Sequence, residues 1–331
     1  MNAVTIVMYH YVRPLERSRY PRLKGLDLAL FREQLGYVRR HYELITAAEL
    51  MAAVRRYPGD GSWDLPPNAL LLSFDDGYAD HFRYVFPLLD ELGLQGCFFP
   101  PVAAIAARRL LTVNRLHFLL AAVAEPRTLV EEISHQLDVH RARFRLRDAR
   151  SYYDELAHPS RYDGAEVVFV KRMLQRALPS QLRDELSQQL FAKYVSADEA
   201  AFAEELYMSR DQLRQMVRHG MYVGSHGCEH LWLSRLDAAG QAAEIDRALA
   251  FLAEIGSATD AWIMCYPHGD FDDKLVSLLR SRGCAAALTT RPAIAIADDD
   301  PLKLPRLDTN DLPKRADAPP CRWTRTVAGL A

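Results

Sequence analysis

The sequence predicts an α/β protein with a mostly parallel sheet and a mostly helical insertion. Short apolar runs typical of buried strands alternate with amphipathic helical segments near both ends of the chain. Between them, about residues 102–208, the spacing is helical and no convincing strand is found. Strands that alternate with helices form parallel sheets, so the pattern is compatible with an open sheet or with a closed barrel.

Residues 1–101 begin this alternation. Thr46 and Glu49 have the spacing of a capping box, and Gly93 is expected to end a helix. The expected elements are a strand over 3–12, a helix from about Asp27, a strand over 42–45, a helix from Thr46, a strand over 69–74, a helix over about 79–92 and a strand over 95–99.

Residues 102–208 are predicted to form the helical insertion. Leu182, Leu186 and Leu190 recur at helical spacing, whereas the segment 167–170 fits either a strand or a helix. This region also carries a dense basic patch, which we interpret as a solvated face rather than as an anion site. The patch consists of Arg141, Arg143, Arg145, Arg147 and Arg150.

Residues 209–331 resume the alternation and complete the sheet that residues 1–101 begin. Ser209 with Gln212 predicts the capped start of a helix. The expected elements are helices over 209–219, about 238–255 and about 272–282, and strands over 221–224, 261–266, 285–289 and 302–307. The Pro-rich remainder is expected to be an extended tail.

Composition argues against several classes of protein. A net charge of −2 gives no electrostatic case for binding nucleic acid or an anionic membrane. The five cysteines are scattered and include no Cys-x-x-Cys pair, which favours free thiols in a reducing compartment. The N-terminal segment lacks the basic lead of a signal peptide, and no apolar run is long enough to cross a bilayer. We therefore expect a cytoplasmic protein; peripheral membrane association and the oligomeric state are left open.

Two adjacent carboxylates, Asp75 and Asp76, end the predicted central strand and precede Gly77. Successive side chains on a strand point to opposite faces, so the two can share a site only where the strand has ended, and Gly77 permits such a turn. The carboxyl ends of strands are where catalytic groups gather in α/β proteins. Taken alone, the same residues also fit an ordinary Asp-Gly turn.

His226 and His230 follow another predicted strand, and their spacing would place both imidazoles on one face of a helical turn. Two imidazoles and one carboxylate form the three-ligand pattern of catalytic zinc, which leaves a position for water. A second carboxylate could then take the proton of that water, so one aspartate of the pair would bind metal and the other would act as base. Spacing alone does not assign the two roles.

A zinc peptidase is an alternative interpretation. His226, Glu229 and His230 fit the pattern H-x-x-E-H, in which Glu229 would be the general base. That motif belongs inside a long helix, whereas here a strand-like segment precedes the first histidine. The peptidase interpretation also leaves Asp75 and Asp76 unexplained.

The motif Ser73-Phe74-Asp75-Asp76-Gly77, followed by Ser225-His226-x-x-x-His230, resembles the polysaccharide deacetylases, the family-four carbohydrate esterases. The resemblance covers 1–101 and 209–331 but not 102–208. It implies a distorted (β/α) barrel that removes acetyl groups from sugars with a divalent metal, zinc before cobalt, nickel or manganese. By position, Asp75 would be the catalytic base, and Asp76, His226 and His230 the metal ligands; no other cofactor is implied.

Tyr266-Pro267-His268 looks like the third motif of this family, with two departures. The backbone N–H of His268 would help to bind the oxyanion. Cys265 stands where the family has an arginine, and we take Arg306, at the end of the last predicted strand, as its replacement.

The second departure concerns the general acid, because no histidine follows His268 in the chain. Met8-Tyr9-His10 resembles a circularly permuted subgroup, the exopolysaccharide deacetylases of the poly-N-acetylglucosamine type. His10 therefore becomes the proposed acid, with His268 as its competitor. Tyr9, Tyr78 and Pro267 are expected to contact the substrate.

The sequence thus predicts a metal-dependent hydrolase that acts on the linear amide of an N-acetylated sugar. The substrate class is an oligosaccharide, a polysaccharide or a glycan precursor. A non-catalytic sugar-binding barrel is the alternative from another class, because the third-motif arginine and the C-terminal histidine are both missing.

Overall fold

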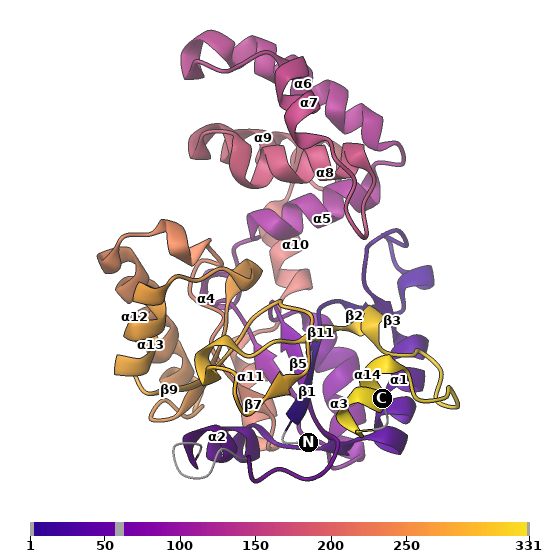
Figure 1. Cartoon of the computed structure of the whole chain (residues 1–331). Coiled ribbons are helices and arrows are strands. Elements are labelled where there is room, and N and C mark those ends of the chain that lie inside the picture. Colours follow the sequence, from indigo (N-terminus) through magenta and orange to yellow (C-terminus); the bar gives the residue numbers. More distant parts are fainter. Residues whose placement is uncertain (1–2, 57–62, 330–331) are drawn as a thin grey trace. The chain divides into compact units, whose positions relative to one another are not determined.

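The computed structural model describes residues 3–56 and 63–329, which divide into two compact units (Figure 1). Unit 1 contains the chain up to Pro14, Gly25–Arg109 and the chain from Ala203 onward; unit 2 contains Leu15–Lys24 and Leu110–Phe202. The segment predicted as an insertion, 102–208, is therefore shared: both of its ends lie in unit 1. Unit 2 also includes Leu15–Lys24, which the sequence had assigned to the sheet-forming part.

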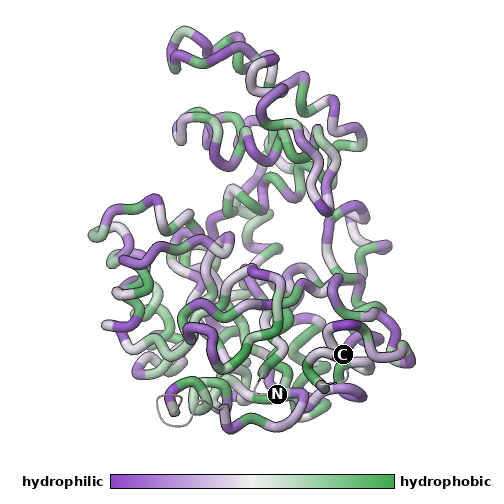
Figure 2. Tube along the Cα trace, viewed as in Figure 1, coloured by the Kyte–Doolittle hydropathy of each residue, from purple (hydrophilic) through white to green (hydrophobic). Residues whose placement is uncertain are grey.

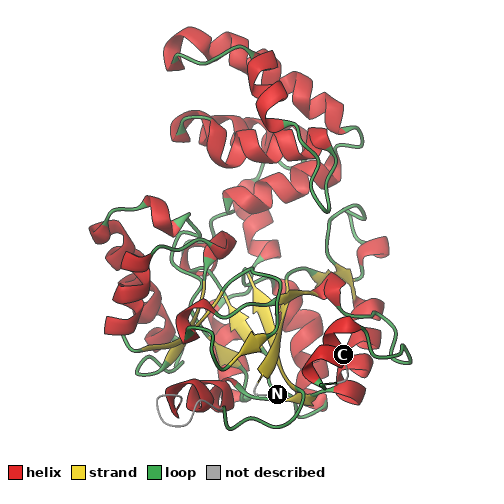
Figure 3. Cartoon of the chain, in the orientation of Figure 1, coloured by secondary structure: helices red, strands yellow, loops and turns green. Residues whose placement is uncertain are grey.

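Unit 1 is built on a ring of parallel strands (yellow in Figure 3). The strands are β1 (Ala3–Tyr9), β5 (Ala69–Asp75), β6 (Cys97–Phe99), β7 (Tyr222–Val223), β8 (Trp262–Cys265), β9 (Cys284–Leu288) and β11 (Leu307–Asp308). Parallel ladders join β11, β1, β5, β6 and β7 in that order, and another joins β8 to β9.

Two single-residue bridges close the ring into a distorted barrel. Ser225, just after β7, pairs with Met264 of β8, and Leu288 of β9 pairs with Leu304, just before β11. The short strands β10 (Ala295–Ile296) and β4 (Glu43–Leu44) extend the sheet beside β1 and β5, and only β10 is antiparallel. A separate pair joins β2 (Val12–Arg13) to β3 (Leu26–Asp27).

Helices of unit 1 follow the strands, and several begin where the sequence predicted. The Asp27 side chain accepts a hydrogen bond at the start of α1, and Ser209 with Gln212 forms the predicted capping box of α11. The helices are α1 (Leu28–His41), α2 (Ala47–Arg56), a π-helical turn (His81–Val85) that leads into α3 (Phe86–Glu91), α4 (Val102–Ala106), α11 (Arg210–Arg218), α12 (Ala238–Glu254), α13 (Asp273–Ser281) and α14 (Arg322–Val327).

The predicted extended tail is wrong in one part, because α14 lies within it. Thr324 of α14 is buried, and its hydroxyl shares hydrogen bonds with the hydroxyls of Tyr37 (2.7 Å) and Tyr42 (2.8 Å). These tertiary contacts stabilise a helix that is too short to persist alone.

The barrel core follows the two-residue period of the strands. Hydrophobic residues concentrate along these strands (green in Figure 2), and all seven residues of β5 are buried. Val4 and Ile6 of β1 belong to the same buried cluster as Leu71, Ile263 and Leu304, among others. Continuing this alternation, His10 and Asp75 point to the side of this cluster, whereas Tyr9 points to the opposite side.

Unit 2 is mostly helical, and its described residues contain no strand. Residues 167–170, which fitted either structure, lie in a helix. The helices are α5 (Thr112–Ala122), α6 (Pro126–Phe144), α7 (Ala149–Leu156), α8 (Ala165–Arg172), a π-helical turn (Met173–Ala177), α9 (Ser180–Tyr194) and the first half of α10 (Glu199–Leu206).

The basic patch of unit 2 is largely neutralised by local ion pairs. Four of its five arginines, Arg141, Arg143, Arg147 and Arg150, pair with Asp138, Glu185, Glu155 and Asp154, and each of these four side chains is at least 45% exposed. This agrees with a solvated face. Among the described residues, none of the helices combines the length and the hydropathy that crossing a membrane requires.

Candidate metal centre

The two aspartates diverge at the end of β5 because the backbone turns there. Asp75 is the last residue of the strand, whereas Asp76 and Gly77 both have left-handed backbones, with φ of 72° and 69°. A Cβ at position 77 would lie 2.7 Å from the Cβ of Pro100, so only glycine fits this turn. The turn brings both carboxylates to the carboxyl end of the barrel, as the sequence predicted.

Asp76, His226 and His230 meet in one buried cluster. The Asp76 Oδ1 atom lies 3.4 Å from the Nε2 atom of His226 and 3.3 Å from that of His230. All three side chains are at most 6% exposed, and Asp76 Oδ1 has no hydrogen-bond partner. Two ligand atoms at about 2.0–2.1 Å from a tetrahedral zinc lie roughly 3.3–3.4 Å apart. The spacing of the three atoms therefore fits a shared divalent cation.

Neighbouring groups orient two of the three candidate ligands, His226 and Asp76. The Nδ1 atom of His226 lies 2.7 Å from the carbonyl oxygen of Cys265, and because a carbonyl only accepts, Nδ1 carries the proton and Nε2 is left for the metal. The Tyr78 hydroxyl donates to Asp76 Oδ2 at 2.5 Å, which leaves Oδ1 as the ligand atom. Burial raises the pKa of Asp76, but its interactions with the neighbouring imidazoles of His226 and His230 hold that pKa well below its usual range.

The segment 226–230 is a loop, so the prediction of a helical turn is wrong. Gly227 and His230 have left-handed backbones, with φ of 69° and 54°. The buried Glu244 of α12 holds this loop, because its Oε2 atom accepts the backbone N–H groups of Cys228 and Glu229, both at 2.9 Å. The two imidazoles converge through this loop geometry.

Glu229 lies outside the candidate metal cluster. Its carboxylate forms ion pairs with Arg109 and Arg247. A peptidase of the H-x-x-E-H type needs that carboxylate beside the metal and a helix around both histidines. The loop and the ion pairs both argue against the peptidase interpretation.

Asp75 is held by Arg306, the residue chosen from sequence as the replacement for the missing arginine. The Nη1 and Nη2 atoms of Arg306 donate to Oδ1 and Oδ2 of Asp75 at 2.9 and 2.8 Å. Nε of the same guanidinium donates to the carbonyl of Thr289 at 2.9 Å. Burial raises the pKa of Asp75, but the charge and hydrogen bonds of Arg306 outweigh it and bring the pKa to about 2. Asp75 is therefore ionised across the physiological range.

The two candidate acids lie in different places. His10 is 36% exposed, and its Nε2 atom lies 4.0 Å from Asp75 Oδ2. The His268 ring instead packs between His230, at a centroid distance of 4.5 Å, and Trp232, on which it stacks at 4.4 Å. Of the two, His10 is the one beside the base.

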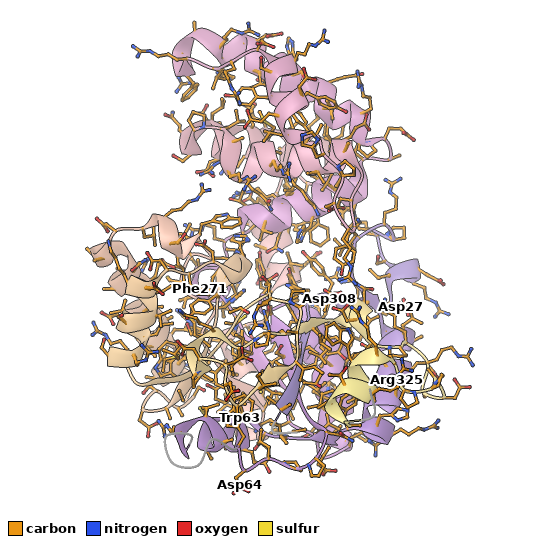
Figure 4. The ribbon with its side chains drawn as sticks, viewed as in Figure 1. Asp27, Trp63, Asp64, Phe271, Asp308 and Arg325 are labelled. Atoms are coloured by element: carbon orange, nitrogen blue, oxygen red, sulfur yellow. The ribbon has the colours of Figure 1, made fainter. Side chains whose placement is uncertain are left out.

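The predicted substrate contacts have different outcomes. Tyr9 is 1% exposed and stacks on Phe74 on the helix side of the sheet, so the prediction that it contacts substrate is wrong. Tyr78 is fully buried and contacts Asp76 instead. Pro267 is buried in the turn that precedes His268. Asp308, labelled in Figure 4, caps the turn after β11 by accepting the backbone N–H of Asn310 at 2.8 Å.

Sequence reasoning missed three residues around the site: Glu244, Trp232 and His81. Glu244 and Trp232 belong to no motif that we recognised. His81 follows the Asp75–Asp80 stretch by a single position, and its nearness to the motif was the one available signal.

Comparison with known proteins found similarity to polysaccharide deacetylases. A family model described as polysaccharide deacetylase matches residues 186–287, which include His226, His230 and His268. No curated protein matches the chain by sequence.

Solved structures of three bacterial proteins share the fold. The deacetylase PplD of Streptococcus pyogenes, solved with acetate, is 14% identical with a TM-score of 0.56, and the match covers 92% of each chain. IcaB of Ammonifex degensii is 18% identical with a TM-score of 0.55, over 100% of this chain and 98% of that one. The BpsB deacetylase domain of Bordetella bronchiseptica is 14% identical with a TM-score of 0.53, over 93% and 96%. At these identities the likeness establishes the distorted barrel fold.

Proposed function

We propose that the chain is a metal-dependent hydrolase of the polysaccharide deacetylase type that removes acetyl groups from an N-acetylated sugar, which the family model over residues 186–287 supports. One observation carries the proposal: the buried Asp76, His226 and His230 cluster lies next to a base, Asp75, that Arg306 holds. The PplD structure was solved with acetate, the product that such a reaction releases.

Asp76, His226 and His230 would hold the metal, and zinc is the ion that their donor atoms and spacing fit best. Cobalt, nickel and manganese are the alternative ions, and their binding affinities should be measured beside that of zinc. When bound, the metal supplies Lewis acidity that makes water nucleophilic near neutral pH.

The remaining steps follow from residues of this chain. The Asp75 carboxylate is ionised and oriented by Arg306, so it accepts the proton of the attacking water. The backbone N–H of His268 would donate to the oxyanion that forms on the acetyl carbonyl. His10, beside Asp75 and partly exposed, would donate a proton to the leaving nitrogen of the sugar. Its exposure gives it access to a proton from solvent in the next cycle.

The proposal is tested by acetate release from chitooligosaccharides, which carry N-acetyl groups on a β-linked glucosamine chain. Protein stripped with a chelator and reloaded with zinc is expected to release acetate, and Asp75→Asn is expected to bind zinc but to lose the activity. If the zinc-loaded protein binds chitooligosaccharides without releasing acetate from a broad panel of N-acetylated sugars, the chain is a sugar-binding barrel. Cleavage of casein that depends on Glu229 and not on Asp75 would support a peptidase instead.

A further inference from the structure

His10 lies between two strands, because β1 ends at Tyr9 and β2 begins at Val12. The ladder between β1 and β5 ends at the pair Tyr9 and Phe74, so the position of His10 must be fixed by other contacts. Three contacts to residues 10–13 come from the segment 78–81, which follows the Asp75–Asp76 turn. Tyr78 stacks on Tyr11 at 4.0 Å, Asp80 accepts a hydrogen bond from Arg13 at 2.6 Å, and His81 contacts His10.

The contact between His81 and His10 is a hydrogen bond to the backbone. Nε2 of His81 lies 2.8 Å from the carbonyl oxygen of His10. A carbonyl oxygen can only accept, so Nε2 of His81 carries the proton. His81 is fully buried, its Nδ1 atom has no hydrogen-bond partner, and the aromatic rings of Phe74, Tyr78 and Phe98 surround it at centroid distances of 5.5–5.7 Å.

These surroundings keep the His81 ring neutral and in one tautomer. Burial lowers the pKa of His81 to about 4, so the ring is uncharged near neutral pH. His81 also begins the π-helical turn His81–Val85, an irregularity found often at functional sites. A histidine at this packed position is hard to explain by packing alone, because one ring nitrogen is buried without a partner and the other has a single one.

We propose that His81 is a positioning residue for the general acid: its ring N–H holds the carbonyl of His10 and so fixes the His10 side chain beside Asp75. This inference rests on the proposed function, in which His10 protonates the leaving nitrogen. An amine leaves only when protonated, whereas an aryl oxide leaves without a proton. Displacing His10 should therefore slow amide hydrolysis far more than the hydrolysis of an aryl acetate.

The test compares a zinc-loaded chitooligosaccharide reaction with 4-nitrophenyl acetate hydrolysis by the same enzyme. His81→Phe keeps the ring volume but removes the donor, and it is expected to lower kcat for acetate release from the sugar about 10–100-fold, within the range of general acid–base effects. The KM should change by less than about twofold, and the loss on the aryl acetate should be at least about tenfold smaller. His81→Gln, which keeps a side-chain N–H, should recover part of the sugar rate.

Two controls separate positioning from damage to the fold. Phe98→Leu disturbs the same aromatic cluster but removes no hydrogen bond to His10. It should therefore lower the melting temperature and should not slow the sugar reaction more than the aryl acetate reaction. Combining His81→Phe with His10→Ala should cost little beyond His10→Ala alone, because both act on one proton transfer. Equal losses on both substrates, or no loss on either, would overturn the proposal.

The contact between His81 and His10 can also be measured in the metal-free protein, without an activity assay. Nitrogen-15 spectra of the histidine rings should show His81 as the neutral Nε2–H tautomer, and His81→Phe should shift the ring signals of His10. Unchanged His10 signals would overturn the role of His81 even if the enzyme is active. Conversely, shifted signals in a protein that releases no acetate would leave the positioning contact standing and contradict the proposed function.

Discussion

Arg306 reaches Asp75 from the opposite end of the chain and binds both of its carboxylate oxygens, at 2.9 and 2.8 Å. The planar fork of a guanidinium fixes a carboxylate in orientation as well as in charge. Cys265, where the family's arginine is expected, is fully buried, and its Sγ atom lies within 4.8 Å of an Asp75 oxygen. A guanidinium from Arg306 therefore lies beside Asp75 although position 265 carries a cysteine.

Removing that guanidinium is expected to impair the base. In Arg306→Ala, Asp75 stays buried, which raises its pKa, but it loses the positive charge that lowers the pKa. The pKa of Asp75 should therefore rise. The acid limb of the kcat profile should therefore move to higher pH, and kcat at pH 7 should fall roughly 100-fold. Acetate release measured from pH 4 to pH 9 checks both effects, and an unchanged acid limb would contradict the role of Arg306.

A relocated arginine provides the matched control for Arg306→Ala. Adding Cys265→Arg to this variant places a guanidinium on β8, close to Asp75, and should recover part of the lost activity. Arg306→Lys should be intermediate, because lysine supplies the charge but not the two parallel hydrogen bonds. Breaking a buried ion pair costs about 3–5 kcal/mol of stability, so the melting temperature of each variant must be recorded with its rate.

Loss of one metal ligand is expected to abolish tight zinc binding. His230→Ala or Asp76→Ala should weaken zinc affinity by more than about 100-fold, since even loss of a supporting residue commonly costs 10–100-fold. Competition with a chromophoric chelator measures this without any substrate. Glu229→Gln is the control, because Glu229 pairs with Arg109 and Arg247 and should leave the affinity unchanged. Wild-type affinity in His230→Ala would show that the cluster is not the metal site.

The residues that support the ligands should matter less than the ligands but still measurably. Tyr78→Phe removes the hydrogen bond to Asp76 Oδ2, and Glu244→Gln weakens the anchor of the 226–230 loop. Each is expected to lower zinc affinity about 10-fold or more. Tyr84→Phe is a control for Tyr78→Phe, since Tyr84 lies in the nearby π-helical turn His81–Val85 and outside the cluster. Zinc affinities equal to the wild type would show that these contacts are only structural.

The sequence pointed to four residues of the candidate centre because each ends or follows a segment with a clear strand pattern. Asp75, Asp76, His226 and His230 all lie at the carboxyl end of the barrel, where the strand assignments placed them. Their local backbone was not predictable to the same degree. A spacing of four fits a helical turn and also a loop, and the left-handed backbone of His230 has no signature in residue type.

Closure of the barrel was likewise left open by the sequence. It depends on two single-residue bridges, at Ser225 and Leu304, and a lone bridge produces no periodic pattern. Tyr9 was misassigned for a different reason: adjacent strand residues face opposite sides, so a site that includes His10 excludes its neighbour. The helix Arg322–Val327 depends on tertiary contacts of Thr324 that no local signal reveals.

Asp75 should also make stability depend on acid pH. Its pKa in the folded protein, about 2, lies below its ordinary value of 3.8, so its ionised form stabilises the fold at pH values above 3.8. This contribution is lost as the pH falls from 3.8 through about 2, and the difference corresponds to about 2 kcal/mol. Asp75→Asn cannot titrate, so the free energy of unfolding in urea should fall by about 2 kcal/mol less between pH 4 and pH 2 in this variant than in the wild type. Parallel pH dependences in the two proteins would mean that Arg306 does not hold Asp75 ionised in the fold.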